Sequence, residues 1–320
     1  SVLQRPLQPL MDDLSALTYA GFERDTIKYA AYQDAMYQYF VDRRAAHAGA
    51  HGTADGAIMP ALRVLIAGAG RGPLVDRCLV AAEAAEVPLD LMALEKSPVA
   101  FLILQRRQRE VWQDRVRLGH GDMRHWRPAD PAWRADLLVS ELLGSLGDNE
   151  LSPECIEGAR PLLADGGAIV PAAYTAFIAP IMSDALWQAA RHAPAPESPY
   201  VVHMRRAQQP WPAQPLWTFT HRGGGGGGSA TDTAMVVFGG APSNGASGPP
   251  WLIHGFAGYF SATLYGDVTL SIEPATTTPG LCSWFAMWLP LATPLLVRPG
   301  EAVAAHVWRC AAAARVWYEW

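Results

Sequence analysis

Cysteine, charge and long apolar runs are all scarce in this chain of 320 residues. The few cysteines lie far apart, form no Cys-x-x-Cys pair and have no histidine nearby at ligand spacing. We therefore expect neither a disulfide framework nor a metal site. These cysteines are Cys78, Cys155, Cys282 and Cys310. Reduced thiols of this kind are typical of a cytoplasmic or nuclear protein.

Charged residues make up only 17% of the chain and hydrophobic residues 50%, which is typical of a globular protein and excludes a disordered one. The net charge of −5 argues against nucleic acid as the main partner and suits a cationic peptide. Two uncharged stretches, residues 166–183 and 281–297, approach the length of a membrane span, but each contains two internal prolines. We expect buried strands there and no membrane association.

The first part of the chain, residues 1–44, predicts an extended start and then helix, with a break at Gly21. It begins with Ser1 rather than methionine and shows no signal-peptide pattern, which leaves open that it belongs to a longer protein. Residues 45–60 predict a surface loop or linker.

Strands and helices alternate over residues 45–170, which predicts a doubly wound, mostly parallel sheet. Ligands bind beyond the carboxyl ends of such strands. The predicted strands are 62–67, 89–94, 116–118 and 136–140, and the predicted helices start at Pro73 or cover 98–111 and 153–163, the last capped by Ser152. The residues at the four strand ends are Gly68, Glu95, Asp122 and Glu141.

The loop over residues 140–150 carries two carboxylates, Glu141 and Glu150. Gly144 and Gly147 allow its backbone to fold back, so that the two acids face one another. Two ionised carboxylates aimed at one point repel unless a cation lies between them, and a planar guanidinium fits such a gap. The alternative is a solvated loop that happens to carry two acids.

A glycine-rich turn, residues 68–73, follows the first strand, and Glu95 ends the second. Because such a turn lets backbone approach a ligand and such an acid accepts hydrogen bonds from ribose, we expect a cofactor that contains a nucleoside. Pro73 stands where the dinucleotide fingerprint has glycine, so that fingerprint fails. Asp122 and Met123 suit an adenine, unless Asp122 only forms a turn.

Residues 171–320 contain short runs rich in Val, Thr and aromatic residues, separated by Pro and Gly. This pattern predicts an all-β domain, either a barrel or a sandwich, with one helix at about 184–193. Two low-complexity stretches, residues 223–228 and 239–250, predict surface loops.

Several motifs together carry a resemblance to a known family. They are Leu7-Gln8-Pro9-Leu10-Met11-Asp12, Ile27-Lys28-Tyr29, Gly68-Ala69-Gly70-Arg71-Gly72-Pro73, Leu94-Glu95-Lys96, Ser140-Glu141-Leu142-Leu143-Gly144-Ser145, Asp148-Asn149-Glu150-Leu151-Ser152-Pro153-Glu154, His254-Gly255-Phe256-Ala257-Gly258-Tyr259-Phe260, Ser283-Trp284-Phe285 and Val316-Trp317-Tyr318-Glu319-Trp320. Over nearly its whole length, the chain resembles the catalytic region of symmetric (type II) protein arginine methyltransferases.

This resemblance implies S-adenosylmethionine as cofactor and a Rossmann-like, class I methyltransferase domain over residues 45–170, followed by a β-barrel domain over residues 171–320. Residues 1–44 would complete the cofactor site. The resemblance assigns the methionine end of the cofactor to Tyr19 and Lys28 with Tyr29 beside them and Gly68 against it, the ribose to Glu95, and the adenine to Asp122 and Met123.

For the substrate, the resemblance assigns Glu141 and Glu150 to the arginine guanidinium and Trp284 to its face, with Ser283 in the same motif. Phe22 takes the place where asymmetric members carry methionine, which favours symmetric dimethylation. An indole face against a guanidinium adds roughly 0.5–2 kcal/mol.

The resemblance also implies partners. We expect arginine-glycine-rich tails as substrates, as in histones and Sm-type RNA-binding proteins, a homo-oligomer, and a location in cytoplasm and nucleus. The family's N-terminal barrel domain, which binds a propeller-shaped protein, has no counterpart here, so that partner is in doubt. The alternatives are a monomethylating enzyme and a non-catalytic scaffold. The intact pair of acids counts against the scaffold.

Overall fold

The computed structural model describes residues 3–12, 14–51, 58–221, 233–239 and 249–320. Its helices are α1 (Ala16–Glu23), α2 (Thr26–His51), α3 (Pro73–Ala85), α4 (Pro98–Arg107), α5 (Ser152–Ala159) and α6 (Asp184–Arg191). Its strands are β1 (Leu62–Ala67), β2 (Leu89–Glu95), β3 (Val116–His120), β4 (Ala135–Val139), β5 (Leu163–Val170), β6 (Ala173–Ile181), β7 (Tyr200–Val202), β8 (Gln214–Thr220), β9 (Thr233–Phe238), β10 (Trp251–Tyr265), β11 (Val268–Ser271), β12 (Ala286–Val297), β13 (Val303–Ala311) and β14 (Val316–Glu319).

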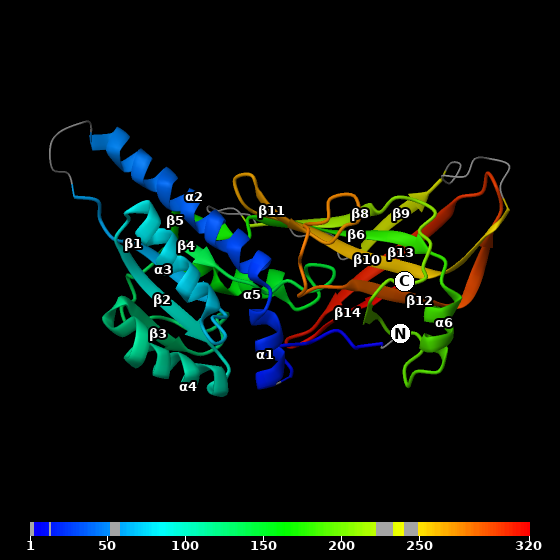
Figure 1. Cartoon of the computed structure of the whole chain (residues 1–320), viewed down its shortest axis with the longest axis horizontal. Coiled ribbons are helices and arrows are strands. Elements are labelled where there is room, and N and C mark those ends of the chain that lie inside the picture. The colour runs from blue at the N-terminus through cyan, green and yellow to red at the C-terminus, as the bar shows by residue number, and fades with distance from the viewer. Residues whose placement is uncertain (1–2, 13, 52–57, 222–232, 240–248) are drawn as a thin grey trace.

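The first half of the fold is a parallel sheet, as the sequence predicts, and its strand order is β3-β2-β1-β4-β5, with β5 added to the four predicted strands. The central strands β1 and β4 are mostly apolar because both faces of the sheet are covered there, and Val64, Leu65 and Ile66 of β1 are fully buried. The strand order reverses between β1 and β4, so a crevice opens beyond the carboxyl ends of these two strands. In Figure 1 this half lies beside the β-rich half, with α1 at the junction between them.

The N-terminal helices differ from the prediction in where they break. Gly21 lies inside α1, where a side chain would meet nothing within 4 Å, so the glycine does not end the helix. The break comes at Asp25 instead, because its carboxylate accepts the backbone N–H of Lys28 and so caps the start of α2. Helix α2 packs on α3. Its buried face repeats with helical spacing: Tyr32, Ala35, Met36, Tyr39 and Phe40.

Several other local predictions need correction or fall on residues outside the described ranges. Helix α2 runs to His51, so the predicted loop over 45–60 begins later, and residues 52–57 lie outside the described residues. The helix predicted over 98–111 changes to a π-helical turn after Arg107. Ser152 is already helical, because Leu151 takes the left-handed conformation (φ 62°) before α5. The predicted loop 223–228 and most of 239–250 are also outside the described residues.

The second half of the described chain is rich in β-strands, as predicted, and its strand pairs are antiparallel. One sheet has the order β7-β12-β10-β6-β8, with β11 paired to β10, and a smaller sheet has the order β14-β13-β9. The long strand β10 is buried along most of its length, and helix α6 packs on it and on β12. The predicted division at residues 170 and 171 falls between β5 and β6.

A buried ion pair joins the two halves. The carboxylate of Asp148, in the loop before α5, is fully buried and accepts from the Nε of Arg309 in β13 at 2.6 Å. It also accepts from Tyr318 and Trp217, at 2.9 and 3.2 Å, so every donor to it comes from the antiparallel half. Arg309 also forms a bidentate pair with Glu154 of α5. Burial raises the pKa of Asp148, and Arg309 opposes that rise.

Removing the Arg309 guanidinium should therefore lower the stability of the folded chain. We expect Arg309→Met to lower the free energy of unfolding by about 3–5 kcal/mol, because it leaves the buried Asp148 carboxylate without its cation. The matched control is Arg298→Met, which breaks an exposed pair with Glu301 and should cost less than about 1 kcal/mol. Urea unfolding measures both values. If both variants lower the free energy of unfolding by the same amount, the buried ion pair does not stabilise the contact between the two halves.

Candidate functional site

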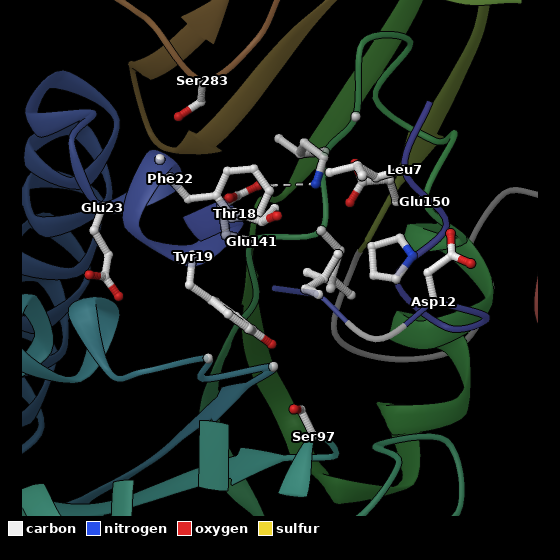
Figure 2. A pocket seen from close by; sticks show the side chains of 18 of the residues that line it. Leu7, Asp12, Thr18, Tyr19, Phe22, Glu23, Ser97, Glu141, Glu150 and Ser283 are labelled. Carbon is white, nitrogen blue, oxygen red and sulfur yellow. Dashed lines mark hydrogen bonds between the residues drawn. The ribbon is translucent and has the colours of Figure 1, made fainter. Parts of the chain in front are cut away.

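A cavity of about 550 Å³ lies where the carboxyl ends of β1, β2 and β4 meet α1 and the antiparallel half. It is within the usual range for small-molecule sites. Figure 2 shows side chains from widely separated segments around it, with Tyr19 and Phe22 on the α1 side and Glu150 on the opposite side.

The glycine-rich turn and Glu95 form one rigid unit. Both carboxylate oxygens of Glu95 accept backbone N–H groups, one from Gly70 and one from Ser97, each at 2.7 Å. Gly70 has a φ of 56°, and a side chain there would come within 3.3 Å of the Tyr19 ring. Glycine is thus required both for the turn and for the approach of Tyr19. Glu95 is 5% exposed and lines the cavity, and each of its carboxylate oxygens can accept a further hydrogen bond.

At the next strand end, Asp122 is held by Arg124. The carboxylate accepts from the backbone N–H, the Nε and the Nη2 of Arg124, at 3.0, 3.1 and 2.6 Å. Burial alone raises the pKa of Asp122, but these bonds outweigh it and the pKa lies below its usual value. Asp122 is therefore an ionised acceptor at the cavity wall. Met123 is buried beside it, and a side chain at Gly68 would come within 3.4 Å of its methyl group.

The two acids of the 140–150 loop stand on a tight hairpin, which we call the acid hairpin (residues 141–150). Gly144 and Gly147 exchange backbone hydrogen bonds at 3.3 and 2.8 Å, as the sequence predicts. Any side chain at Gly144 would collide with Asn149, whose Oδ1 accepts the backbone N–H of Leu146 at 2.7 Å. The Asn149 side chain thus stabilises the turn. The turn in its place brings Glu141 and Glu150 to the same cavity.

Lys28 lies beside Glu141 and is surrounded by aromatic rings that also line the cavity. The Nζ of Lys28 lies 2.8 Å from Glu141 Oε2, and the lysine is fully buried. Three rings surround its ammonium group, those of Phe22, Tyr29 and Trp284, with centroids at 5.3, 4.8 and 5.1 Å. This is an aromatic cage closed by a carboxylate, and it suits a cation.

Glu150 has no such partner among the hydrogen bonds and ion pairs of the described residues. Burial and the nearby charge of Glu141 raise its pKa to about 8, although Lys28 lowers it. The protonated form is favoured near neutral pH, because ionisation would leave a buried charge without solvent and place a second negative charge beside Glu141. A cation brought between the two acids would favour ionisation of both.

The cavity brings together every residue that the sequence analysis predicted for the site. All of them line it: Tyr19, Phe22, Lys28, Tyr29, Gly68, Glu95, Asp122, Met123, Glu141, Glu150, Ser283 and Trp284. Their individual roles remain predictions. Sequence reasoning missed two residues that shape the site, Asp25, which does not line the cavity, and Asn149, which does. An acid three residues before Lys28 is a helix-cap signal that could have found Asp25.

Neither a metal cluster nor a membrane helix is found in the part of the chain that the structure describes. No group of three or more His, Cys, Asp and Glu side chains could hold a metal ion among the described residues. No helix among them is long and apolar enough to cross a membrane.

The parallel sheet and the cavity at its carboxyl edge define a Rossmann-like methyltransferase fold followed by an antiparallel β-rich domain. A solved structure of similar fold is the Trypanosoma brucei PRMT1 enzyme-prozyme heterotetrameric complex with AdoHcy, with a TM-score of 0.69 and 16% identity. The match covers 93% of this chain and 89% of that one.

Family comparisons are more specific. Residues 1–170 match the PRMT5 arginine-N-methyltransferase family and residues 173–320 the PRMT5 oligomerisation domain. The chain is 40% identical to protein arginine N-methyltransferase skb1 of Schizosaccharomyces pombe and 39% identical to protein arginine N-methyltransferase 5 of Xenopus laevis. Each match covers 99% of this chain, but only 50% and 49% of the relative. The chain belongs to the PRMT5 family and spans about half the length of these curated relatives.

The lysine that pairs with Glu141 should influence the ionisation of Glu150. We expect Lys28→Met to raise the pKa of Glu150 above about 8, because the positive charge that lowers it is lost. Carbon-13 NMR of the Glu150 carboxyl group follows the titration. Lys96→Met, which removes the chain's other lysine, is the control and should leave the pKa near about 8. A lower pKa of Glu150 in Lys28→Met would contradict this arrangement of charges.

Proposed function

We propose that this chain transfers methyl groups from S-adenosylmethionine to arginine guanidinium nitrogens of proteins, giving monomethylarginine and symmetric dimethylarginine. The observation that supports this most is that Glu141, Glu150 and an aromatic cage around a buried cation line one cavity. Family membership supports the same reaction.

The residues present fit the cofactor. Glu95 is held by backbone and keeps lone pairs for the ribose hydroxyls, and the ionised Asp122 can accept from an adenine amine. Lys28 is the cation available for the carboxylate of the amino-acid end, once it leaves Glu141. When bound, S-adenosylmethionine supplies a methyl group on a sulfonium centre.

The two acids would orient the substrate. Arginine stays protonated because its pKa exceeds about 12, so its nitrogens are poor nucleophiles. Glu141 and Glu150 can localise the positive charge on two of them and leave the third facing the methyl group. Trp284 is held for this task, since its indole N–H donates to the backbone carbonyl of Leu143 in the acid hairpin and its ring packs edge-on to Phe260. Catalysis would come mainly from positioning and electrostatics.

The partners follow from the same proposal. A cationic, flexible substrate such as an arginine-glycine-rich tail of a histone or Sm-type protein suits two acids in a cavity. The oligomerisation-domain match over residues 173–320 supports a homo-oligomer. We place the activity in cytoplasm and nucleus, where such tails occur.

Incubation with labelled S-adenosylmethionine and an arginine-glycine-rich peptide, followed by mass spectrometry, tests the proposal. Mono- and symmetric dimethylarginine are expected. A product that stops at monomethylarginine would support the monomethylating alternative. No transfer, with the cofactor bound, would support a scaffold.

Neutralising either acid should stop the reaction and spare the cofactor. We expect Glu141→Gln and Glu150→Gln each to lower kcat at least about 100-fold, since each removes a carboxylate that must hold the guanidinium in the transition state. Cofactor affinity, measured by calorimetry, should stay nearly unchanged. Glu157→Gln, at a surface pair with Arg160, is the control. A variant of either acid that loses cofactor affinity and keeps turnover would overturn the assignment.

Phe22 should determine which product forms. Its rigid ring lies 5.3 Å from the ammonium of Lys28, at the wall of the cage, whereas an unbranched methionine would leave room beside a methylated nitrogen. We expect Phe22→Met to add asymmetric dimethylarginine to the products, which fragmentation mass spectrometry separates by neutral loss. Phe285→Met, at a ring that contacts His203, is the control and should keep the symmetric product alone. An active Phe22→Met variant that makes only symmetric dimethylarginine would show that Phe22 packs in the cavity wall without selecting the product.

A further inference from the structure

Asp25 is a buried acid that does not line the cavity but is hydrogen-bonded to residues of two of its walls. It lies between α1 and α2 and is only 1% exposed. One carboxylate oxygen accepts the backbone N–H of Lys28 at 3.1 Å. The other accepts the backbone N–H groups of Cys282 and Ser283, at 2.9 and 2.7 Å, from the turn before β12.

These bonds join the two sides of the candidate site. The first fixes the start of α2, which brings Lys28 and Tyr29 into the cavity. The other two fix the turn that carries Trp284, whose indole is in turn bonded to the acid hairpin. One carboxylate thus holds the lysine and the tryptophan in register, with the Lys28 ammonium 5.1 Å from the Trp284 ring.

Capping alone does not explain a charged residue here. Serine or asparagine caps a helix as well as aspartate does. Burial raises the pKa of Asp25, but the N–H groups of Cys282, Lys28 and Ser283 outweigh it and the pKa lies below its usual value. The carboxylate is therefore an ionised group that uses both oxygens. Only the bonds to the 282–283 backbone require the second oxygen.

We propose that Asp25 is a positioning residue that couples the cofactor side of the site to the substrate side, by tying the Lys28 helix end to the Trp284 turn. The inference rests on the proposed function, because it takes Lys28 toward the cofactor and Trp284 toward the arginine. A cofactor held by Lys28 restrains the start of α2, and the bonds of Asp25 carry this restraint to the segment that holds Trp284. Peptide affinity therefore depends on whether the cofactor site is filled.

Asp25→Ser separates the two tasks of this residue. Serine retains the cap of α2 but is too short to reach the 282–283 backbone. Asp25→Asn keeps the size of the side chain and one acceptor oxygen. Asp34→Ser is the matched control, because it removes an exposed acid from α2. Calorimetry gives the affinity for S-adenosylhomocysteine and, with and without it, for an arginine-glycine peptide. Hydrogen exchange with mass spectrometry follows the amides of residues 282–283.

In wild type and Asp34→Ser, S-adenosylhomocysteine should tighten peptide binding and slow exchange at residues 282–283. In Asp25→Ser its own affinity should stay within about twofold, while the peptide binds at least tenfold more weakly in its presence and the slowing disappears. Asp25→Asn should lie between. Transfer by Asp25→Ser should show a raised KM for peptide and an unchanged KM for cofactor.

Two results would overturn the inference: exchange at residues 282–283 that does not respond to S-adenosylhomocysteine in wild type, or that responds equally in Asp25→Ser. If serine prevents folding, the same comparison with Asp25→Asn decides. Failure of the proposed function looks different. Wild type would then transfer no methyl group, while the exchange measurement, which needs no turnover, still tests the link through Asp25.

Discussion

Two carboxylates that share one cavity need a cation, and this constraint explains much of the molecule. The acid hairpin presents Glu141 and Glu150 to the same space, and Lys28 supplies the positive charge. Three aromatic rings and the surrounding protein exclude water from that ammonium, so the interaction is stronger than on a surface. Burial and the negative charge of Glu141 raise the pKa of Glu150 to about 8, so the protonated form of Glu150 is favoured and the repulsion between the two acids is reduced.

The two halves of the chain cooperate to maintain this geometry. The parallel sheet supplies Glu95, Asp122 and the start of the acid hairpin at one edge, where ligands bind in such folds. The antiparallel half supplies the cage tryptophan and the buried Arg309, which binds Asp148 only two residues from Glu150. Neither half alone contains a complete site. This dependence is consistent with two family matches that meet near residue 170.

Much of this was predictable from sequence, for local reasons. The parallel strands are short apolar runs ended by glycine or acid, so their positions and the residues at their carboxyl ends could be predicted. The contacts that complete the site were not. Asp25 binds backbone 257 residues away, and Lys28 binds an acid 113 residues away. No local pattern records such pairs. The sequence analysis places the helix break at Gly21 because glycine has a low helix propensity. The break instead occurs at Asp25, whose carboxylate caps the start of α2.

The central claim is that the pair of acids is built to hold a guanidinium. Its most direct test is proton release when an arginine-glycine peptide binds the chain saturated with S-adenosylhomocysteine, measured by calorimetry at pH 7 in buffers of different ionisation enthalpy. A guanidinium between the acids should ionise Glu150, whose pKa is about 8 without it, and release more than about half a proton. Peptide binding whose heat is the same in every buffer would contradict the account.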